Sequence, residues 1–287
     1  METRFLQTFL SVIDTGSAAE AARRMNITPS AVNQRIKALE AEIGQQLLRR
    51  AGQRMQPTAA ADALMATARE ILGLEENMKA IASADGGIGR LRVGVIQTVL
   101  TGLMPDILLR LRRSQPGIGL YLAPGTSSEL YAQLTQGELD VAILVKPHFP
   151  LPKSFNWTTL RRERHLLISP PGQGEVDAMT MLRREPFIRY DRNHWGGRAV
   201  DQYLRARKIQ PHELHELDSL EAIVIMVSRG LGISIIPNWP TPWPQGARVE
   251  QIELTDAPLR EVGFIWSRSA IRLPLIQRFI SETDPSL

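Results

Sequence analysis

Residues 17–44, SAAEAARRMNITPSAVNQRIKALEAEIG, decide how the first part of this chain is interpreted. Ser17 and Glu20 have the spacing of a capping box, in which the serine accepts from a backbone N–H and the glutamate reaches back. The run that follows is rich in alanine, and Thr28 followed by Pro29 then predicts the start of another helix. The stretch therefore predicts two short helices joined by a tight turn.

The second of these helices has two different faces. One is apolar and is expected to be buried, because its members recur at spacings of four, three and four: Val32, Ile36, Leu39 and Ile43. The other is polar with one positive charge and consists of Ser30, Asn33, Gln34 and Lys37. Side chains that hydrogen-bond base edges near the amino end of such a helix are typical of a recognition helix in the major groove. A solvated face of an ordinary helical bundle is the alternative.

A helix before this stretch and a hairpin after it complete the predicted motif. Residues 3–13 carry Phe5, Leu6, Phe9, Leu10 and Ile13 on one stripe, which predicts a first helix. Arg49, Arg50 and Arg54 surround Gly52, which predicts a short hairpin, or wing, whose arginines reach phosphate or the minor groove. Residues 1–60 contain eight Lys or Arg (4, 23, 24, 35, 37, 49, 50, 54) and five acids (2, 14, 20, 40, 42), which favours a polyanionic partner. An unspecific basic surface is the alternative.

From Thr58 to about residue 84 the sequence predicts one long helix. Its apolar stripe recurs every three or four residues: Leu64, Ala68, Ile71, Leu74, Met78 and Ile81. Because an isolated helix of this length cannot bury its stripe alone, pairing with a second copy of the chain is expected. Packing onto the same chain is the alternative. The sequence DGGIG at 85–89 then predicts a flexible hinge between domains.

After residue 90 the chain alternates between strands and helices. Apolar β-branched runs such as 90–98 and 141–146 are separated by amphipathic helices, a pattern typical of a parallel sheet covered on both faces. A second unit of the same kind begins near His165, and the last strand and helix return to the first unit. Two α/β lobes joined by two crossings form a cleft, so a ligand is expected between them.

Bulk composition restricts the classes of protein that fit. The net charge is +4 and the sequence contains no cysteine, so disulfides and thiolate metal sites are excluded and a cytoplasmic location is expected. The first residues reach Asp14 before a long apolar run builds up, so neither a signal peptide nor a membrane span is expected.

With these features together, the sequence resembles the LysR-type transcriptional regulators over essentially its whole length. The match is dense in FLQTFLSVIDTGSAAEAARRMNITPSAVNQRIKALEAEIGQQLLRR at 5–50, and it continues more weakly through GELDVAILV at 137–145 and SLEAIVIMVSRGLGISIIP at 219–237. Asn33, Leu48 and Ala61 depart from the family's usual residues, which concerns the DNA target rather than the motif.

The resemblance implies an α/β protein with an all-α winged helix-turn-helix at the N-terminus, a long linker helix and a two-lobed, periplasmic-binding-protein-like effector domain. It implies a homodimer, formed through the linker helix, that assembles into tetramers, with DNA and a small molecule as partners and no cofactor. The expected boundaries are 1–57 for DNA binding, 58–85 for the linker helix, 86–89 for the hinge and 90–287 for the effector domain. Lobe 1 is then about 90–163 with 262–287, and lobe 2 about 164–261.

Carried over residue by residue, the resemblance assigns eight positions to DNA: Thr28, Pro29, Ser30, Asn33, Gln34, Lys37, Arg50 and Arg54. The amides of Asn33 and Gln34 suit bidentate pairing with adenine, whereas the hydroxyls and cations are expected to contact mainly phosphates.

For the effector, the resemblance points to three short stretches: Gln97-Thr98-Val99, Gly125-Thr126-Ser127 and Trp195-Gly196. The first two each precede a predicted helix, whose free N–H groups and dipole favour an anion. Lys146 and Arg192 are further candidates, with a solvated surface position as the alternative for each, and Trp195 is expected either to form a wall of the site or to belong to the core. A small carboxylate is therefore the expected ligand.

Three other classes of protein are less well supported. His212 and His215 lie three apart beside two glutamates, but they follow a proline and lack a third ligand, so the run is interpreted as a polar helix start rather than a metal site. The serine elbow of a hydrolase and the glycine pattern of a dinucleotide site are both missing, so an enzyme is not expected. If the chain were a solute-binding protein of a transport system, its first ninety residues would have no role. If it were an architectural DNA protein, the two-lobed domain would have none.

Overall fold

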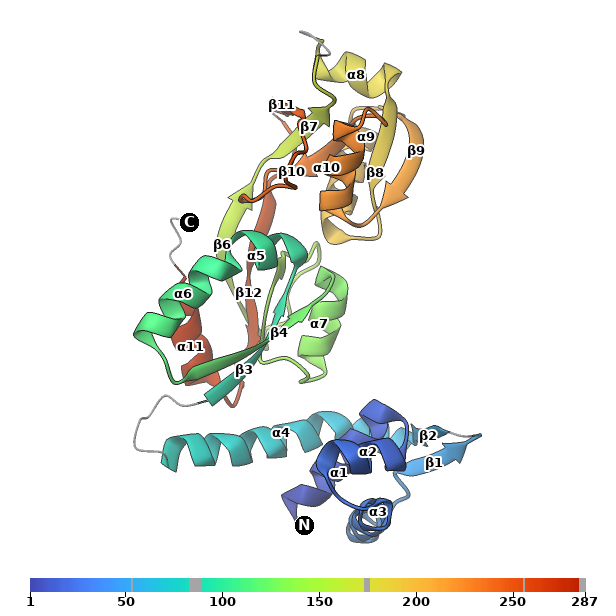
Figure 1. The fold of residues 1–287 in the computed structure, drawn as a ribbon, viewed down its shortest axis with the longest axis vertical. Helices are drawn as coiled ribbons and strands as arrows, with labels where there is room; N and C mark the ends of the chain where they lie inside the picture. Colours follow the sequence, from blue (N-terminus) through green and yellow to red (C-terminus); the bar gives the residue numbers. More distant parts are fainter. Residues whose placement is uncertain (53, 83–88, 173–175, 255, 284–287) are drawn as a thin grey trace. The chain divides into compact units, whose positions relative to one another are not determined.

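The computed structural model describes residues 1–52, 54–82, 89–172, 176–254 and 256–283 of the chain. The chain divides into two compact units: Met1–Gly89 with Thr135–Glu138, and Arg90–Leu134 with Leu139–Leu287. The first is mainly helical and the second contains sheets covered by helices (Figure 1).

Three helices of the first unit form the expected helix-turn-helix. They are α1 Thr3–Thr15, α2 Ala18–Met25 and α3 Pro29–Ile43. Ser17 Oγ accepts from the N–H of Glu20 at 3.4 Å, and Thr28 Oγ1 accepts from the N–H of Ala31 at 3.2 Å, so both predicted caps form. The glutamate half of the capping box is different, because the Glu20 carboxylate pairs with Arg23.

The apolar face of α3 is buried as predicted, except at its last residue. Val32, Ile36 and Leu39 pack in one core with Leu6 and Phe9 of α1. The prediction that Ile43 is buried is wrong: it is 36% exposed. Ile43 ends the helix, and the chain turns away at Gly44 in a left-handed conformation (φ +73°), so no further turn covers its side chain.

The predicted wing is an antiparallel hairpin of β1 Leu48–Ala51 and β2 Arg54–Pro57. Two contacts hold it to the helices. Glu40 Oε1, from α3, accepts from the N–H groups of Leu47 at 2.8 Å and Leu48 at 3.1 Å. The N–H of Met55 donates to the carbonyl of Gly16 at 2.9 Å.

The predicted long helix is α4 Ala59–Ala82, and the Thr58 hydroxyl accepts from the N–H of Ala61 at 3.3 Å. Its apolar stripe divides into two parts. Ala68, Leu64 and Ile71 pack into the core of the helix-turn-helix, whereas Leu74 and Met78 are 50% and 71% exposed. Packing within the described residues therefore accounts for Leu64, Ala68 and Ile71 but not for Leu74 and Met78, and the side chain of Ile81 lies outside the described residues. The expected hinge at 86–88 lies outside the described residues, and Gly89 begins a strand.

Lobe 1 of the second unit has a five-stranded sheet, with helices on both faces (Figure 1). In sheet order the strands are β4 Ile118–Pro124, β3 Gly89–Val95, β5 Val141–Val145, β12 Arg260–Ser267 and β6 Phe155–Glu163. The helices are α5 Gln97–Gly102, α6 Met104–Ser114, α7 Ser127–Thr135 and α11 Leu273–Ser281. The expected parallel pairing is found between β3 and β5, but the sheet is mixed, because β12 returns antiparallel to both β5 and β6.

Lobe 2 contains β7 His165–Ser169 between β10 Ser234–Pro237 and β11 Glu250–Glu253, all antiparallel, and the parallel pair β8 Pro186–Tyr190 and β9 His212–Leu217. The N–H of Ile188 donates to the carbonyl of Ile233 at 2.8 Å and links the two groups of strands. Helices α8 Ala178–Arg184 and α9 Trp195–Ala206 cover one core, and α10 Leu220–Ser228 covers the other.

Three strands were not expected from the sequence: β6, β9 and β11. The helix start expected at 212–218 is wrong, because this segment is β9 and pairs with β8 along its length. Four of its six residues are His or Glu and most are exposed, so it lacks the apolar pattern of a buried strand. No described helix is both long enough and apolar enough to span a membrane.

Candidate DNA interface and effector site

The polar face of α3 is open to solvent over its whole length. Thr28, Pro29, Ser30, Asn33, Gln34 and Lys37 are all exposed. No acidic residue lies in the first turn of α3, so the partial positive charge of its N-terminus is not neutralised locally. Among the described residues, the side chains of Asn33, Gln34 and Lys37 have no hydrogen-bond or ion-pair partner. This face therefore offers amide, hydroxyl and ammonium groups to an external partner.

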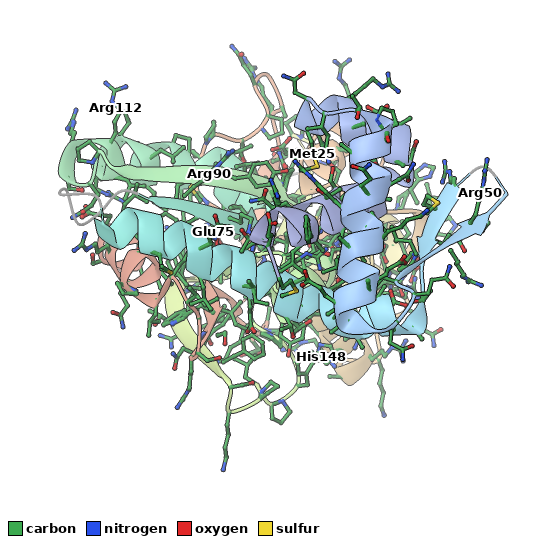
Figure 2. All side chains as sticks on the ribbon, turned by 90° about the horizontal axis from the view of Figure 1, so that it is seen from below. Met25, Arg50, Glu75, Arg90, Arg112 and His148 are labelled. Carbon is green, nitrogen blue, oxygen red and sulfur yellow. The ribbon has the colours of Figure 1, made fainter. Side chains whose placement is uncertain are left out.

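The wing presents its arginines at the edge of the same unit. Arg50 is exposed and lies on the hairpin, which projects away from the helices (Figure 2). Its Nε donates to the carbonyl of Gly52 at 3.2 Å, which orients the side chain at the turn. Arg54 is also exposed, at the start of β2.

Glu40 is a residue of this surface that sequence reasoning missed. Its carboxylate holds the start of the wing, while its own helix carries Asn33 and Gln34. Together with the hydrogen bond from Met55 to Gly16, this side chain therefore fixes the position of the wing relative to α3. Nothing in the sequence distinguishes Glu40 from a surface acid, because the contact depends on where the chain returns after α3.

In the second unit, a cavity of about 480 Å³ lies between the two lobes. We call it the lobe cavity. Lobe 1 contributes the starts of α5 and α7, and lobe 2 contributes the starts of α9 and α10. Five predicted effector residues line it: Gln97, Thr98, Thr126, Ser127 and Trp195. Its volume lies within the ordinary range for small-molecule sites.

The hydroxyl groups of Thr98 and Ser127 are buried in the wall of the lobe cavity. Thr98 Oγ1 accepts from Arg260 Nη2 at 3.1 Å, and Ser127 Oγ accepts from the N–H of Val145 at 3.1 Å. Neither hydroxyl hydrogen has an acceptor among the described residues. Because a buried donor without an acceptor is costly, both hydroxyls are suited to a ligand oxygen.

Arg260 is the second residue that sequence reasoning missed. It begins β12, is 4% exposed and lines the lobe cavity. Its Nη1 donates to Glu163 Oε2 at 2.7 Å, and Glu163 is equally buried. The pair links β12 to β6, the two strands that lead from lobe 1 to lobe 2 (Figure 1). Only the fold brings these two charges together, since they are nearly a hundred positions apart.

Three other predicted effector residues lie outside the lobe cavity. Val99 is buried in the core of lobe 1. Lys146 borders a smaller cavity of about 210 Å³, and its Nζ donates to Glu261 at 3.1 Å. Burial alone would raise the pKa of Glu261, but hydrogen bonds from Thr159, Lys146 and Trp157 outweigh burial and lower this pKa.

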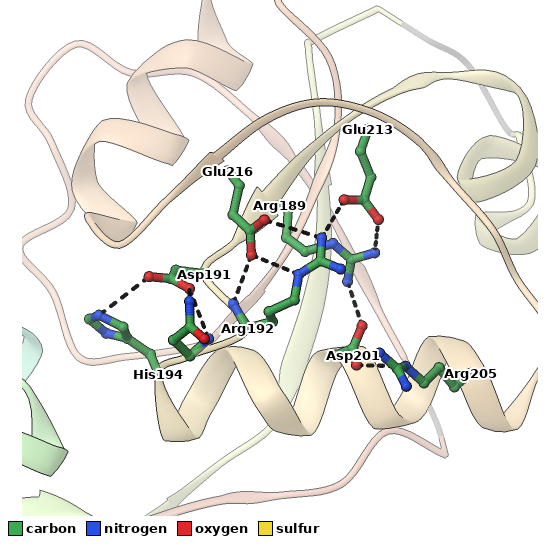
Figure 3. Close-up of polar contacts among 9 residues, drawn as sticks. Arg189, Asp191, Arg192, His194, Asp201, Arg205, Glu213 and Glu216 are labelled. Carbon is green, nitrogen blue, oxygen red and sulfur yellow. Dashed lines mark hydrogen bonds and ion pairs between the residues drawn. The ribbon is translucent and has the colours of Figure 1, made fainter.

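Arg192 belongs to a network of ion pairs at the edge of lobe 2 (Figure 3). Its guanidinium pairs with Glu213 at 2.5 Å and with Glu216 at 2.9 Å, both on β9. The buried Arg189 pairs with Glu213 and, at 3.4 Å, with Asp201 of α9. These contacts raise the pKa of Arg192, chiefly through the hydrogen bond to Glu216. The arginines thereby fasten the charged strand β9 to β8 and α9.

Trp195 combines both of its expected roles. It borders the lobe cavity and packs against aromatic rings of lobe 1, with ring centroids 5.9 Å from Tyr131 and 5.7 Å from Phe149. Nearby, Arg198 Nη1 lies 2.7 Å from His148 Nε2. Trp195 is thus a direct contact between a wall of the cavity and the opposite lobe.

The alternative of a metal enzyme gains no support from the described residues. They contain no group of three His, Cys, Asp or Glu side chains placed to hold a metal ion. His212 and His215 are exposed on β9.

Comparison with known proteins decides the family. Residues 3–62 match the family model described as bacterial regulatory helix-turn-helix protein, lysR family, and residues 84–284 match the LysR substrate binding domain. The chain belongs to the LysR family. The resemblance deduced from the sequence is therefore confirmed, as is its fold class of a helical DNA-binding region followed by a mixed α/β domain.

Relatives of this LysR-family chain include the transcriptional regulator CzcR of Bacillus cereus, 29% identical over 83% of this chain and 81% of CzcR. YnfL of Escherichia coli, an uncharacterized regulator, is 28% identical over 97% and 96%.

Among solved structures, full-length OxyR from Pseudomonas aeruginosa has a TM-score of 0.73 at 23% identity, over 99% of this chain and 94% of OxyR. CbnR in complex with its target DNA has a TM-score of 0.69 at 23% identity, over the whole of both chains. As a member of this family, the protein is a DNA-binding transcriptional regulator with a substrate-binding domain, and not an enzyme.

Proposed function

We propose that this LysR-family regulator recognises its operator through α3 and the wing, and that a small carboxylate in the lobe cavity modulates its activity. The observation that carries the proposal is the occurrence, in one chain, of an open polar face on a capped recognition helix and a cavity with unsatisfied buried hydroxyls. The first offers groups to DNA, and the second offers groups to a ligand.

On DNA, the amides of Asn33 and Gln34 are the base-reading groups, because an amide can pair with adenine through a donor and an acceptor at once. The remaining contacts are mainly to phosphates, which position the protein without reading sequence. They are assigned to Thr28, Pro29, Ser30, Lys37, Arg50 and Arg54. Glu40 supports both the base contacts and the phosphate contacts, because it holds the wing to α3.

In the lobe cavity, the carboxylate of the effector accepts from the hydroxyls of Thr98 and Ser127, with Gln97 and Thr126 beside them and Trp195 as the apolar wall. Arg260 adds a guanidinium already oriented by Glu163. Val99, Lys146 and Arg192 support the site from outside the cavity. Val99 packs in the core of lobe 1, and Lys146 and Arg192 form ion pairs within their own lobes.

The working assembly is a homodimer joined through the linker helix 58–85, with DNA-binding domain 1–57, hinge 86–89 and effector domain 90–287, and pairs of dimers form tetramers. The exposed half of the α4 stripe supports the dimer. Effector binding shifts the population between lobe arrangements and so changes the geometry in which two DNA-binding domains meet the operator. A regulator of this kind acts in the cytoplasm, where the bacterial DNA lies.

The test is footprinting and equilibrium binding on DNA flanking the protein's own gene, with and without a panel of small carboxylates and amino acids. A salt-sensitive, site-specific footprint that changes with one compound is expected. The response should be lost in Thr98→Val, which keeps the shape of the side chain and removes its hydroxyl, while the footprint without ligand remains. A Thr98→Val protein that responds like the wild type would contradict the effector site, and absence of any specific footprint from a folded protein would contradict the DNA assignment.

A further inference from the structure

We propose that the effector carries an ammonium group as well as a carboxylate, as an apolar α-amino acid does. This rests on the effector role proposed for the lobe cavity and specifies the ligand further. The observations are the charges on the cavity wall and the division of hydrogen-bonding groups between the two lobes.

The described wall of the lobe cavity has an excess of negative charge. Arg260 is its only lysine or arginine, and its guanidinium already forms an ion pair with the buried carboxylate of Glu163. Three carboxylates line the same cavity: Glu129, Asp218 and Glu221. The imidazole of His194 also lines it, and its Nε2 lies 3.8 Å from Asp191 Oδ2. A ligand with a negative charge alone would therefore enter a site whose remaining fixed charges repel it.

The three carboxylates differ in whether they are already engaged. Glu129 Oε2 accepts from the N–H of Thr126 at 2.9 Å, and this hydrogen bond lowers the pKa of Glu129, so the group stays ionised. Asp218 and Glu221 form no hydrogen bond or ion pair through their side chains within the described residues. These two acceptors of lobe 2 are free to pair with donors of a ligand.

The carboxylates of the described wall that have no partner lie in lobe 2, where the phenol of Tyr190 also has no hydrogen-bond partner among the described residues. Lobe 1 offers the buried hydroxyl donors of Thr98 and Ser127, and lobe 2 offers the carboxylate acceptors of Asp218 and Glu221. A zwitterion satisfies both, with its carboxylate at lobe 1 and its ammonium at lobe 2. Charge-assisted hydrogen bonds at both ends favour such a ligand over one with a single charged group.

Asp218 and Glu221 also lie near the N-terminus of α10, where acids stabilise a helix. That end is already capped, because Ser219 Oγ accepts from the N–H of Ala222 at 3.2 Å. A role confined to the helix would affect stability and leave the choice of ligand unchanged. The side chain of the ligand is expected to be apolar, since Val145, Trp195 and Leu220 also line the cavity.

The experiment is calorimetric titration of the full chain with matched trios of compounds. Each trio contains an amino acid, the acid without its amine, and the amine without its carboxylate: L-phenylalanine, 3-phenylpropionate and 2-phenylethylamine, or L-leucine, 4-methylpentanoate and 3-methylbutylamine. The other apolar L-amino acids complete the panel. One amino acid is expected to bind at least about tenfold more tightly than either analogue, the difference that one charge-assisted hydrogen bond provides.

The variant Asp218→Asn/Glu221→Gln should lose that preference, because the amino acid binds about tenfold more weakly while the deaminated acid binds no less tightly. Asp106→Asn is the matched control, since it removes an exposed acid near the start of another helix, α6, away from the cavity. It should keep the wild-type preference.

Three results would overturn the ammonium proposal: a deaminated acid that binds as tightly as its amino acid, an unchanged preference in the double variant, or no binding by any amino acid of the panel. A different result would count against the effector site itself. If an amino acid binds Thr98→Val as tightly as the wild type, the ligand lies outside the lobe cavity.

Discussion

Gln34 and Arg50 differ in what each side chain can recognise on DNA. Gln34 is exposed on α3 and offers one amide donor and one acceptor, a combination that matches the edge of adenine. Arg50 is exposed on the wing and offers a charge that any phosphate satisfies. Base reading and phosphate binding are therefore separable by substitution.

Gln34→Ala should relax the sequence preference at one base position, by about 1–3 kcal/mol of lost discrimination, and leave the salt dependence nearly unchanged. Arg50→Ala should weaken binding to all sequences alike and reduce the slope of log affinity against log salt by about 1. Fluorescence anisotropy on the operator and on single-base variants, at several salt concentrations, measures both.

Two exposed residues that lie outside the polar face of α3 and outside the wing serve as controls. Gln45→Ala removes an amide beyond the end of α3, and Arg112→Ala removes a cation from α6. Both should behave like the wild type. An Arg50→Ala protein with unaltered affinity and slope would show that the wing does not contact DNA.

At the scale of elements, α4 carries one stripe with two different environments. Ala68, Leu64 and Ile71 are covered by the helix-turn-helix, whereas Leu74 and Met78 are exposed among the described residues. Burying a large apolar side chain provides about 1.5–3 kcal/mol. The exposed half is therefore expected to drive association between two copies of the helix.

Leu74→Glu and Met78→Glu should each raise the dissociation constant of the dimer by about tenfold or more, because each replaces an apolar contact with a charge in the interface. Sedimentation equilibrium over a range of concentrations measures this change. Ala66→Glu adds the same charge at an exposed position on a different face of α4 and should leave the dimer intact. Equal association of all three variants would place the interface elsewhere.

At the scale of the whole molecule, His165 connects pH to the stability of the fold. It begins β7, is 1% exposed, and its Nδ1 lies 2.6 Å from the carbonyl oxygen of Pro258. Burial lowers its pKa from 6.5 to about 4, because the charged imidazolium is poorly solvated there. The unfolded chain therefore binds a proton more readily than the folded chain in this range.

The folded state should be fully stabilised by neutral His165 above pH 6.5 and should lose this contribution as the pH falls toward 4. By pH 4.5 the loss should reach about 2–3 kcal/mol, at 1.36 kcal/mol per pKa unit. Urea unfolding of the wild type and of His165→Gln at pH 7.5 and 4.5 measures the difference.

Glu213 and Glu261, whose pKa values are lowered in the folded state, also contribute less stability as the pH falls. Both residues are present in the wild type and in His165→Gln, so their contribution cancels in the comparison. His212→Gln, at an exposed position on β9, is the control. An identical pH dependence for wild type and His165→Gln would mean that His165 is already accessible to protons in the folded state.

Most of the helices and buried strands could be predicted from the sequence, because their determinants are local. The caps at Ser17 and Thr28, the apolar face of α3 and the glycine at the turn of the wing all lie within a few residues of what they control. The charged strand β9 could not be predicted, since its place depends on arginines of β8 and the loop after it. The antiparallel pairing of β12 with β5 could not be predicted either, since it depends on where the chain returns to lobe 1.

The sequence by itself determined the family, the helices of the DNA-binding unit, the open face of α3 and five residues of the lobe cavity, because residue type and spacing along the chain specify these features. The tertiary structure alone decided that Arg260 meets Glu163, that Glu40 holds the wing, and that Lys146 and Arg192 point to partners outside the cavity. It also brought Asp218 and Glu221 to the wall opposite Thr98. The physical reason is that charge pairing acts through space, over a few ångströms, between groups whose separation along the chain carries no information about their distance.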